Sequence, residues 1–338
     1  MPNGDSGPTG IEYIMKLSRG FWESALVLSA NEVGLFEALA NGPRTAQEVA
    51  HARGTDLRAT TMVLDALVAL KVLTKEDGRY TNTEAAQAVF VPGGGAYMGD
   101  MMRHSLNMWD SWGNLANVLR TGSPVPREGS VAPLSDEHRT RNFIRAMYQG
   151  GVHSAEILMD RLDLSRVRRM LDVGGGPGHY CFAAARRNPS LHATVFDLPR
   201  TLTITREYIK EHGMEDRVDT VAGDFNKDEL PRGFDLVLMS QVLHSNTRSE
   251  CAALVAKGYA SLNPGGHLVI NEFALDEDRT SPVSAALFSV NMLANTAGGS
   301  AYTRAEITEW METAGLEEIS TMDLGGRSTV FVGLKPAA

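Results

Sequence analysis

Residues 171–180 read LDVGGGPGHY, and this stretch decides the fold of the larger part of the chain. An apolar run ends at Asp172 and Val173 and glycines follow at once, which is typical of a buried strand entering a turn where the backbone approaches a ligand. Further apolar runs then alternate with segments of helix length: HATVFDL, VDTVAGDF, FDLVLMSQVL, HLVINEFAL, EEISTMDLG and STVFVGL. This alternation predicts an α/β fold, a doubly wound and mainly parallel sheet with helices on both faces.

The connection between the last two of these seven runs is very short, since it consists of Gly325, Gly326 and Arg327. A tight turn joins antiparallel strands. We therefore expect the seventh strand of the sheet to run against the others.

The N-terminal part has a different pattern. Residues 11–40 carry apolar side chains at helical spacing, and this surface needs cover from a partner subunit or from the rest of the chain. Residues 45–89 then read as a helix, a break, a second helix and two short strands around the turn at Asp77 and Gly78. That order predicts a winged helix-turn-helix.

A winged helix raises the possibility of DNA binding, and the charge of this chain disfavours it. Between residues 41 and 89 the basic residues are matched one for one by acidic ones, and the second helix is mostly apolar, so no basic face is predicted. The net charge of the 338-residue chain is −9, which gives no long-range attraction to nucleic acid or to an anionic membrane.

The sequence also bears on location. Its first ten residues lack the order of a signal peptide, and no apolar run reaches the ~20 residues that span a bilayer. The two cysteines, Cys181 and Cys251, form no disulfide framework and lie near no metal-site pattern. We predict a cytoplasmic protein that does not associate with membranes.

The glycine spacing separates two classes of nucleotide ligand. The dinucleotide fingerprint Gly-x-Gly-x-x-Gly would need a third glycine where this chain has His179. Gly174, Gly176 and Gly178 instead form Gly-x-Gly-x-Gly. A nicotinamide dinucleotide is therefore disfavoured.

Acidic residues follow the next two strands of the predicted sheet. Asp197 comes at the end of the second strand, where a carboxylate accepts hydrogen bonds from ribose hydroxyls. Asp224 follows the third strand, beside Phe225. A carboxylate there can accept from the amino group of adenine while the aromatic ring covers the base. Together these residues predict an adenosine site.

The stretches LDVGGGPG, VFDLP, GDF, VLMSQVLH and NPGGHLVINE resemble the S-adenosylmethionine (SAM) dependent small-molecule O-methyltransferases that carry an N-terminal winged-helix dimerisation domain. The resemblance covers nearly the whole chain. It implies a homodimer formed through the N-terminal helices, SAM as cofactor with S-adenosylhomocysteine as product, no metal, and an aromatic or polyketide-like acceptor. It also implies three regions: a dimerisation domain (1–95), a helical connector contributing to the substrate pocket (96–165) and a SAM-binding domain (166–338).

A base near the cofactor would help this chemistry, because a phenol with a pKa near ~10 is mostly protonated at neutral pH. His244 ends the run FDLVLMSQVLH, which places it at the carboxyl end of the fourth strand or in the loop after it, on the same rim as the glycine loop, and the resemblance makes it the base. Glu272, at the end of the fifth strand, either orients the imidazole or braces the strand end. Asp172 likewise either braces the glycine turn or faces the methionine amino group.

The strand-end pattern and the resemblance together predict the remaining site residues. The predicted cofactor-binding residues are Asp172, Gly174, Gly176, Gly178, Asp197, Leu198, Asp224, Phe225 and Ser240. The predicted substrate-wall residues are Trp109, Trp112, Phe143, Met147, Phe288 and Met292. The alternative interpretation of each is a side chain that packs in the core.

Two departures from the family pattern leave alternatives open. The usual His-Asp-Trp reads His244-Ser245-Asn246, and an acid common in Gly-Gly-x-Glu-Arg-Thr is replaced by Ala301. One of the two acids that flank the base is therefore missing. A SAM-binding relative that catalyses hydroxylation or another modification is the first alternative, and a ligand-sensing DNA-binding regulator is the second.

Overall fold

The computed structural model describes residues 10–124, 136–325 and 328–337. The chain forms two compact units, Met1–Asn107 and Met108–Ala338, and each has its own hydrophobic core. The boundary between the units lies inside the segment predicted to connect the two domains.

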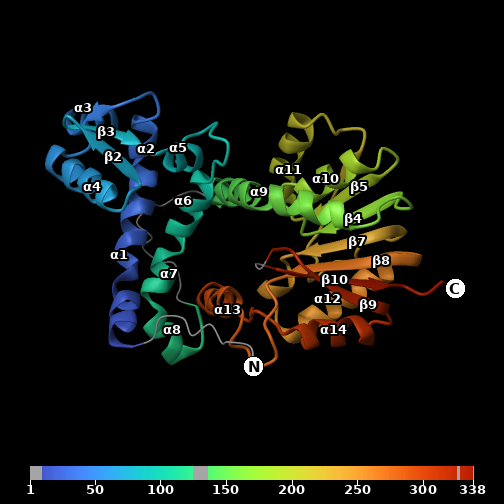
Figure 1. Cartoon of the computed structure of the whole chain (residues 1–338). Helices are drawn as coiled ribbons and strands as arrows, with labels where there is room; N and C mark the ends of the chain where they lie inside the picture. The colour runs from blue at the N-terminus through green and yellow to red at the C-terminus, as the bar shows by residue number, and fades with distance from the viewer. Residues whose placement is uncertain (1–9, 125–135, 326–327, 338) are drawn as a thin grey trace, which may run out of the picture. The chain divides into compact units, whose positions relative to one another are not determined.

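The N-terminal unit has the predicted winged-helix order (Figure 1). Its sheet has the strand order β1-β3-β2, with both neighbouring pairs antiparallel. At the tip of the β2–β3 hairpin, Asp77 and Gly78 both have left-handed backbone angles (φ 46° and 74°), as in the turns that match the twist of a hairpin. The elements are α1 (Ile11–Val33), α2 (Leu35–Ala38), β1 (Arg44–Thr45), α3 (Ala46–Arg53), α4 (Leu57–Ala69), β2 (Leu73–Glu76), β3 (Arg79–Asn82), α5 (Glu84–Phe90) and α6 (Gly99–Asn107).

Local sequence explains where the helices α3 and α4 of the winged helix begin and end. Thr45 and Glu48 form a reciprocal capping box at the start of α3, and Gly54 ends that helix in the left-handed conformation. Asp56 then caps α4 by accepting the backbone N–H of Ala59. The break between the two helices is therefore one helix end followed directly by the next helix start.

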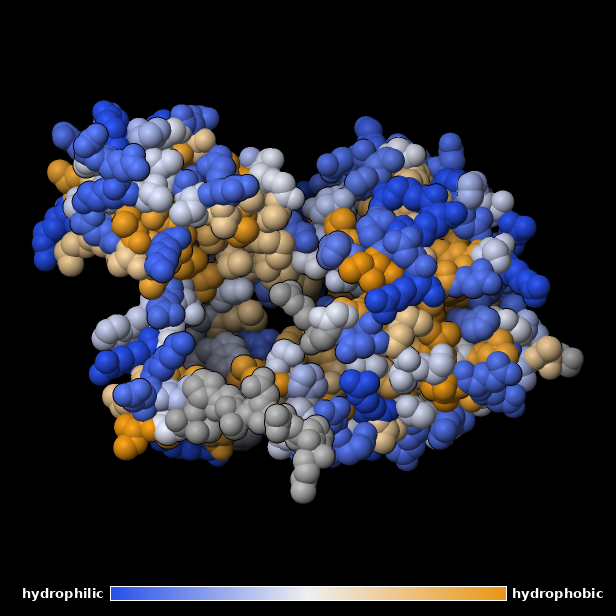
Figure 2. Space-filling model, viewed as in Figure 1, coloured by the Kyte–Doolittle hydropathy of each residue, from blue (hydrophilic) through white to orange (hydrophobic). Residues whose placement is uncertain are grey.

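Apolar side chains of α1 reach the surface. Ile14 and Trp22 are each 63% exposed, and Ile11, Leu17 and Phe21 are exposed as well. In the view of Figure 2, apolar areas also lie among the hydrophilic surface of the N-terminal unit. Within the described residues, no helix combines the length and the apolar character needed to cross a membrane.

The C-terminal unit contains a seven-stranded sheet with the order β6-β5-β4-β7-β8-β10-β9. The strands are β4 (Arg169–Val173), β5 (His192–Asp197), β6 (Val218–Ala222), β7 (Phe234–Ser240), β8 (Leu262–Glu272), β9 (Glu317–Asp323) and β10 (Thr329–Leu334). The first five pair in parallel, and β10 runs antiparallel to both β8 and β9, which confirms the predicted orientation of the last strand. Gly326 and Arg327 of the predicted turn lie outside the described residues.

Helices cover both faces of this sheet. Along β7, Leu236 and Leu238 pack into one core with α9, α10 and α11, while Val237 and Met239 pack into a second core with α12 and α14. Figure 1 shows α10 and α11 on one side of the sheet and α12 and α14 on the other. The helical elements are α7 (Trp109–Gly113), α8 (Leu115–Thr121), α9 (Asp136–Arg161), α10 (His179–Arg187), α11 (Pro199–Glu211), the 3₁₀ turn η1 (Leu243–Ser245), α12 (Arg248–Ser261), α13 (Val283–Asn295) and α14 (Arg304–Thr313).

The strand order places the site. The chain moves outward from β4 through β5 to β6, then returns to β7 on the other side of β4. Ligands of open α/β sheets bind beyond the carboxyl ends of the strands at such a reversal. The glycine loop after β4 and the His244 turn after β7 therefore lie on neighbouring strand ends.

The two-sided burial of β7 predicts a large stability effect. Leu238→Ala, in a fully buried central position, should lower the free energy of unfolding by about 2–5 kcal/mol, because it removes apolar contacts and leaves a cavity. Val221→Ala, on the edge strand β6 and 37% exposed, is the control and should cost far less. Denaturant unfolding of the C-terminal unit measures both, and equal losses would contradict the packing described.

Candidate functional site

The glycine loop follows β4 and has the backbone that only glycine adopts readily. Gly174, Gly176 and Gly178 have φ angles of 67°, 53° and 84°. A Cβ on Gly174 would lie 2.6 Å from Cγ1 of Val242 and 3.4 Å from Cε1 of Phe225. The structure thus brings Phe225 to the glycine loop, although the two come from different strand ends.

Asp197, at the end of β5, contacts the same loop. Its Oδ2 accepts the backbone N–H of Gly176 at 2.9 Å, and its Oδ1 accepts that of Leu198 at 2.7 Å. Burial raises the pKa of this carboxyl, while the two backbone donors act in the opposite direction. A carboxylate has about four acceptor positions on its two oxygens, so it can accept further hydrogen bonds in addition to those from the backbone.

Thr205 is a contact that sequence reasoning missed. This fully buried residue of α11 donates its hydroxyl to the carbonyl oxygen of Gly176 at 2.6 Å. Both backbone groups of Gly176 are therefore held by side chains, the N–H by Asp197 and the C=O by Thr205. No local pattern marks Thr205, because the contact depends on how α11 packs against the loop.

Asp172 lies buried beneath the loop. Its Oδ2 accepts the thiol of Cys181 at 3.7 Å, while its buried Oδ1 has no hydrogen-bond partner. Burial, with a smaller effect from Asp197, raises the pKa of Asp172 to about 8. A Cβ on Gly175 would lie 2.6 Å from its carboxyl carbon, so the carboxyl group supports the turn from below.

Asp224, predicted to accept from adenine, is paired with a neighbour. Its Oδ2 lies 2.9 Å from Nζ of Lys227, and its Oδ1 accepts the backbone N–H of Asn226 at 3.0 Å. The hydrogen bond from Lys227 holds the pKa of Asp224 below its usual value. The Lys227 side chain is 81% exposed, and such an ion pair is weak, so it competes little with a ligand.

Ser240 belongs to a buried polar cluster that the sequence did not reveal. Asn271, on the adjacent strand, donates from Nδ2 to Ser240 Oγ at 3.0 Å and to the Tyr180 hydroxyl at 3.1 Å. The Oδ1 of Asn271 is buried without a partner. A signal for Asn271 existed in the sequence, since an amide inside the apolar run HLVINE is unusual in a buried strand.

His244 and Glu272 form the predicted pair. The imidazole Nδ1 lies 2.9 Å from Glu272 Oε2, and both side chains are largely buried. Oε1 of the same carboxylate accepts the backbone N–H groups of Leu243 and His244 at 2.8 and 3.3 Å, and Oε2 accepts that of Phe273 at 3.2 Å. The sequence allows two roles for Glu272, to orient the imidazole or to brace the strand end. Its carboxylate makes the contacts that both roles require.

Two aromatic rings lie near the imidazole. Phe288 of α13 meets His244 edge-on with 4.8 Å between ring centroids, and Phe273 lies 6.1 Å away. Met292 is buried on the same helix. Trp112 of α7 donates from Nε1 to Asn291 Oδ1 at 2.9 Å, which ties α7 to α13.

The other predicted wall residues are not placed against His244 by a described contact. Trp109 is half-buried on α7, Met147 is half-buried on α9, and Phe143 is exposed on α9. Ile144, next to Phe143, lies 3.9 Å from where a Cβ on Gly176 would be. This turn of α9 therefore borders the glycine loop.

The departures from the family pattern have distinct surroundings. Ala301 is buried in a small apolar cluster with Leu275 and Ala285, so this position offers no carboxylate to the imidazole. The next residue toward the N-terminus, Ser300, donates its backbone N–H to the carbonyl oxygen of His244 at 2.9 Å. Ser245 donates its hydroxyl to Val242 O at 2.9 Å, which closes the turn that carries His244.

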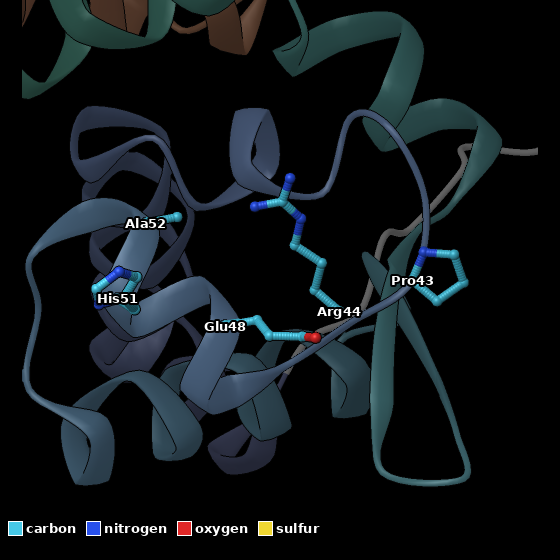
Figure 3. A pocket seen from close by; sticks show the side chains of 5 residues that line it. All are labelled: Pro43, Arg44, Glu48, His51 and Ala52. Atoms are coloured by element: carbon cyan, nitrogen blue, oxygen red, sulfur yellow. The ribbon is translucent and has the colours of Figure 1, made fainter.

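Two surface hollows contain none of the predicted site residues. The one in Figure 3 lies in the N-terminal unit and is lined by Pro43, Arg44, Glu48, His51 and Ala52. The other is lined by Met159, Asp160, Leu162, Leu164, Ser165, Arg187, Asn188 and Pro189. Among the described residues, no group of three or more His, Cys, Asp or Glu side chains is arranged to hold a metal ion.

Comparison with known proteins identifies the family. Residues 130–317 match the O-methyltransferase domain, and residues 15–92 match the O-methyltransferase dimerisation domain. The chain belongs to the O-methyltransferase family. The predicted family, enzyme class and SAM cofactor are thereby confirmed.

Individual O-methyltransferase relatives match along nearly their whole length. A 3-hydroxy-5-methyl-1-naphthoate 3-O-methyltransferase of Streptomyces sahachiroi is 37% identical over 94% of each chain. A tetracenomycin polyketide synthesis 8-O-methyl transferase of Streptomyces glaucescens is 33% identical over 96% of each chain. The crystal structure of human N-acetylserotonin methyltransferase in complex with SAM superposes with a TM-score of 0.84 at 27% identity, covering 99% of this chain and 100% of that one.

Asp172 predicts a pH dependence of stability. Its raised pKa means that the folded, cofactor-free O-methyltransferase keeps a proton that the unfolded chain releases above about pH 4, so this residue's contribution to stability falls as pH rises toward 8. Asp172→Asn removes that dependence. Between pH 5 and 7 the variant should gain about 1.4 kcal/mol per pH unit relative to wild type in denaturant unfolding. A pH-independent difference would contradict a protonated Asp172.

Proposed function

We propose that this O-methyltransferase transfers a methyl group from SAM to a hydroxyl of an aromatic, polyketide-like small molecule, with His244 as general base. The observation that carries the proposal is the 2.9 Å contact between Nδ1 of His244 and Oε2 of Glu272. Because an ionised carboxylate only accepts hydrogen bonds, we assign the proton of the neutral imidazole to Nδ1, which leaves Nε2 unprotonated. The two bacterial relatives are named for a naphthoate and for a tetracenomycin polyketide, which supports the acceptor class.

The residues at the strand ends fit the cofactor. The glycine loop admits close approach of a ligand, Asp197 presents two acceptor oxygens, and Phe225 lies beside the loop as a cover for a flat base. Oδ1 of Asp172 is buried without a hydrogen-bond partner in the protein, and in the cofactor-bound enzyme a nearby cation would favour the ionised form of this carboxyl, in which Oδ1 is an acceptor. A cationic amino group is the kind of donor that this oxygen lacks, so we assign Asp172 to the methionine end as well as to bracing the loop.

The protein has to contribute only alignment of the acceptor and removal of its proton. When bound, SAM supplies a methyl group already activated by its sulfonium centre. The protein aligns the acceptor oxygen and removes its proton, and we assign the uptake of that proton to His244 Nε2. Glu272 holds the tautomer and stabilises the imidazolium that results.

The acceptor wall is apolar and aromatic on the α13 side. Phe288 and Phe273 lie beside the imidazole, and Met292 is buried one turn further along α13 than Phe288, a set of side chains that favours a planar aromatic acceptor. We assign Trp112 to the same wall because it is tied to α13 through Asn291. Trp109, Phe143 and Met147 remain predictions from the resemblance.

We further propose that the enzyme is a cytoplasmic homodimer. The match to the dimerisation domain covers the N-terminal helices, and α1 exposes Ile14, Leu17, Phe21 and Trp22 along its length. A second copy of this apolar helix is the expected cover. The balanced charges of the winged helix give no support to a DNA partner.

Product mass tests the proposed reaction. Purified protein is incubated with SAM and a panel of phenols and aromatic polyketides, and we expect a product that has gained one methyl group. His244→Ala should lower kcat by about 10²–10⁴-fold, the range for loss of a general base. The matched control is His192→Ala, an exposed histidine at the start of β5, which should leave kcat unchanged.

Other products of that experiment would contradict the proposal in distinct ways. Methyl transfer that survives in His244→Ala would remove the assigned base. A gain of oxygen in place of a methyl group would favour hydroxylation, the alternative motivated by Ala301.

A further inference from the structure

Asn246 is one of the two positions where the base turn departs from the family pattern, and its side chain is fully used. It is buried, with 3% exposed. Its Nδ2 donates to the carbonyl oxygen of Val242 at 2.8 Å, and its Oδ1 accepts from Nδ2 of Asn226 at 2.7 Å. The orientation of the amide is determined by these partners, because a flipped amide would set two oxygens against each other at Val242.

The two partners of Asn246 come from separate parts of the sheet. Asn226 follows β6, while Val242 follows β7, and the strand order β6-β5-β4-β7 puts two strands between them. Neighbouring strands lie about 4.8 Å apart, so no ladder hydrogen bond joins β6 to β7. The segment after β6 therefore crosses the strand ends to reach the His244 turn, and it passes the glycine loop, where Phe225 lies beside Gly174.

The residues on either side of this link belong to the proposed site. Residues 224–226 contain Asp224 and Phe225, assigned to the adenine end of the cofactor. The turn at residues 242–245 carries His244. The backbone oxygen of Asn246 also accepts the hydroxyl of Tyr302, so the Asn246 end of the link is anchored in the core.

We propose that Asn246 is a positioning residue that couples the adenine-side segment, residues 224–226, to the turn that carries the base. Binding of the adenosine moiety orders the segment, the Asn226–Asn246 hydrogen bond transmits this order, and the Val242 contact sets the turn. The proposal rests on the proposed function, since it assigns the two segments to cofactor and base. It makes cofactor binding and base alignment interdependent in this chain.

Asn226→Ala tests the coupling with little risk to folding, because Asn226 is exposed. We expect two effects: weaker binding of S-adenosylhomocysteine by calorimetry, and a lower kcat at saturating SAM. Each effect should be up to about tenfold, the size expected for one hydrogen bond of typical strength. A role confined to local structure would instead lower the melting temperature and leave kcat at saturating SAM unchanged.

A double-mutant cycle isolates the link itself. In an Asn246→Ala background, Asn226→Ala should have no further effect on either quantity, because the hydrogen bond is already lost. The matched control is Asn263→Ala, which removes a similar side-chain hydrogen bond, to Asp235 Oδ1 at 2.8 Å, at the opposite ends of β7 and β8. It should leave both quantities unchanged.

Two results would overturn the coupling: additive effects of the two substitutions, or a kcat of Asn226→Ala equal to that of wild type. Both results are measured in an enzyme whose wild type transfers methyl groups, so they test the coupling and not the proposed function. Failure of the proposed function is seen separately, as wild-type protein that yields no methylated product.

Discussion

The arrangement of the site depends on one buried carboxylate. Glu272 ends β8 and accepts three backbone N–H groups, from Leu243, His244 and Phe273, and its Oε2 also lies 2.9 Å from Nδ1 of the His244 imidazole. A carboxylate in low dielectric is stable only with such partners, and the same partners define the turn after β7. The strand end, the turn and the imidazole of His244 are therefore held by a single group, and a change at Glu272 would alter all three.

The sheet topology explains why a few side chains are enough to hold the loops of the site together. Reversal of strand order between β4 and β7 opens the carboxyl ends of the strands, and the loops after β4, β5, β6 and β7 meet there. Asp197 and Thr205 hold Gly176 from two sides, and Asn246 joins the segment after β6 to the turn after β7. The loops are thus connected by side-chain hydrogen bonds rather than by the sheet.

Much of this was predictable from sequence because the signals are local. Apolar runs marked the strands, the short last connection marked the antiparallel strand, and Asp197 and His244 were marked by following such runs. Thr205 and the Asn226–Asn246 link could not be predicted, because they join segments far apart in the sequence. Lys227 was missed as the partner of Asp224, although it lies close in sequence, because an exposed lysine gives no sign of its partner. The acceptor wall depends on the packing of α7, α9 and α13, which periodicity does not specify.

The proposed role of His244 depends on the tautomer of its imidazole, and nitrogen NMR of histidine-labelled enzyme measures that tautomer directly. His244→Ala identifies the resonances. At a pH where the imidazole is neutral, we predict a protonated Nδ1, because Glu272 accepts from it, and an unprotonated Nε2 available to the acceptor. A neutral ring with its proton on Nε2 would contradict the proposed role of Glu272 and leave His244 without an unprotonated Nε2 to accept the proton of the substrate.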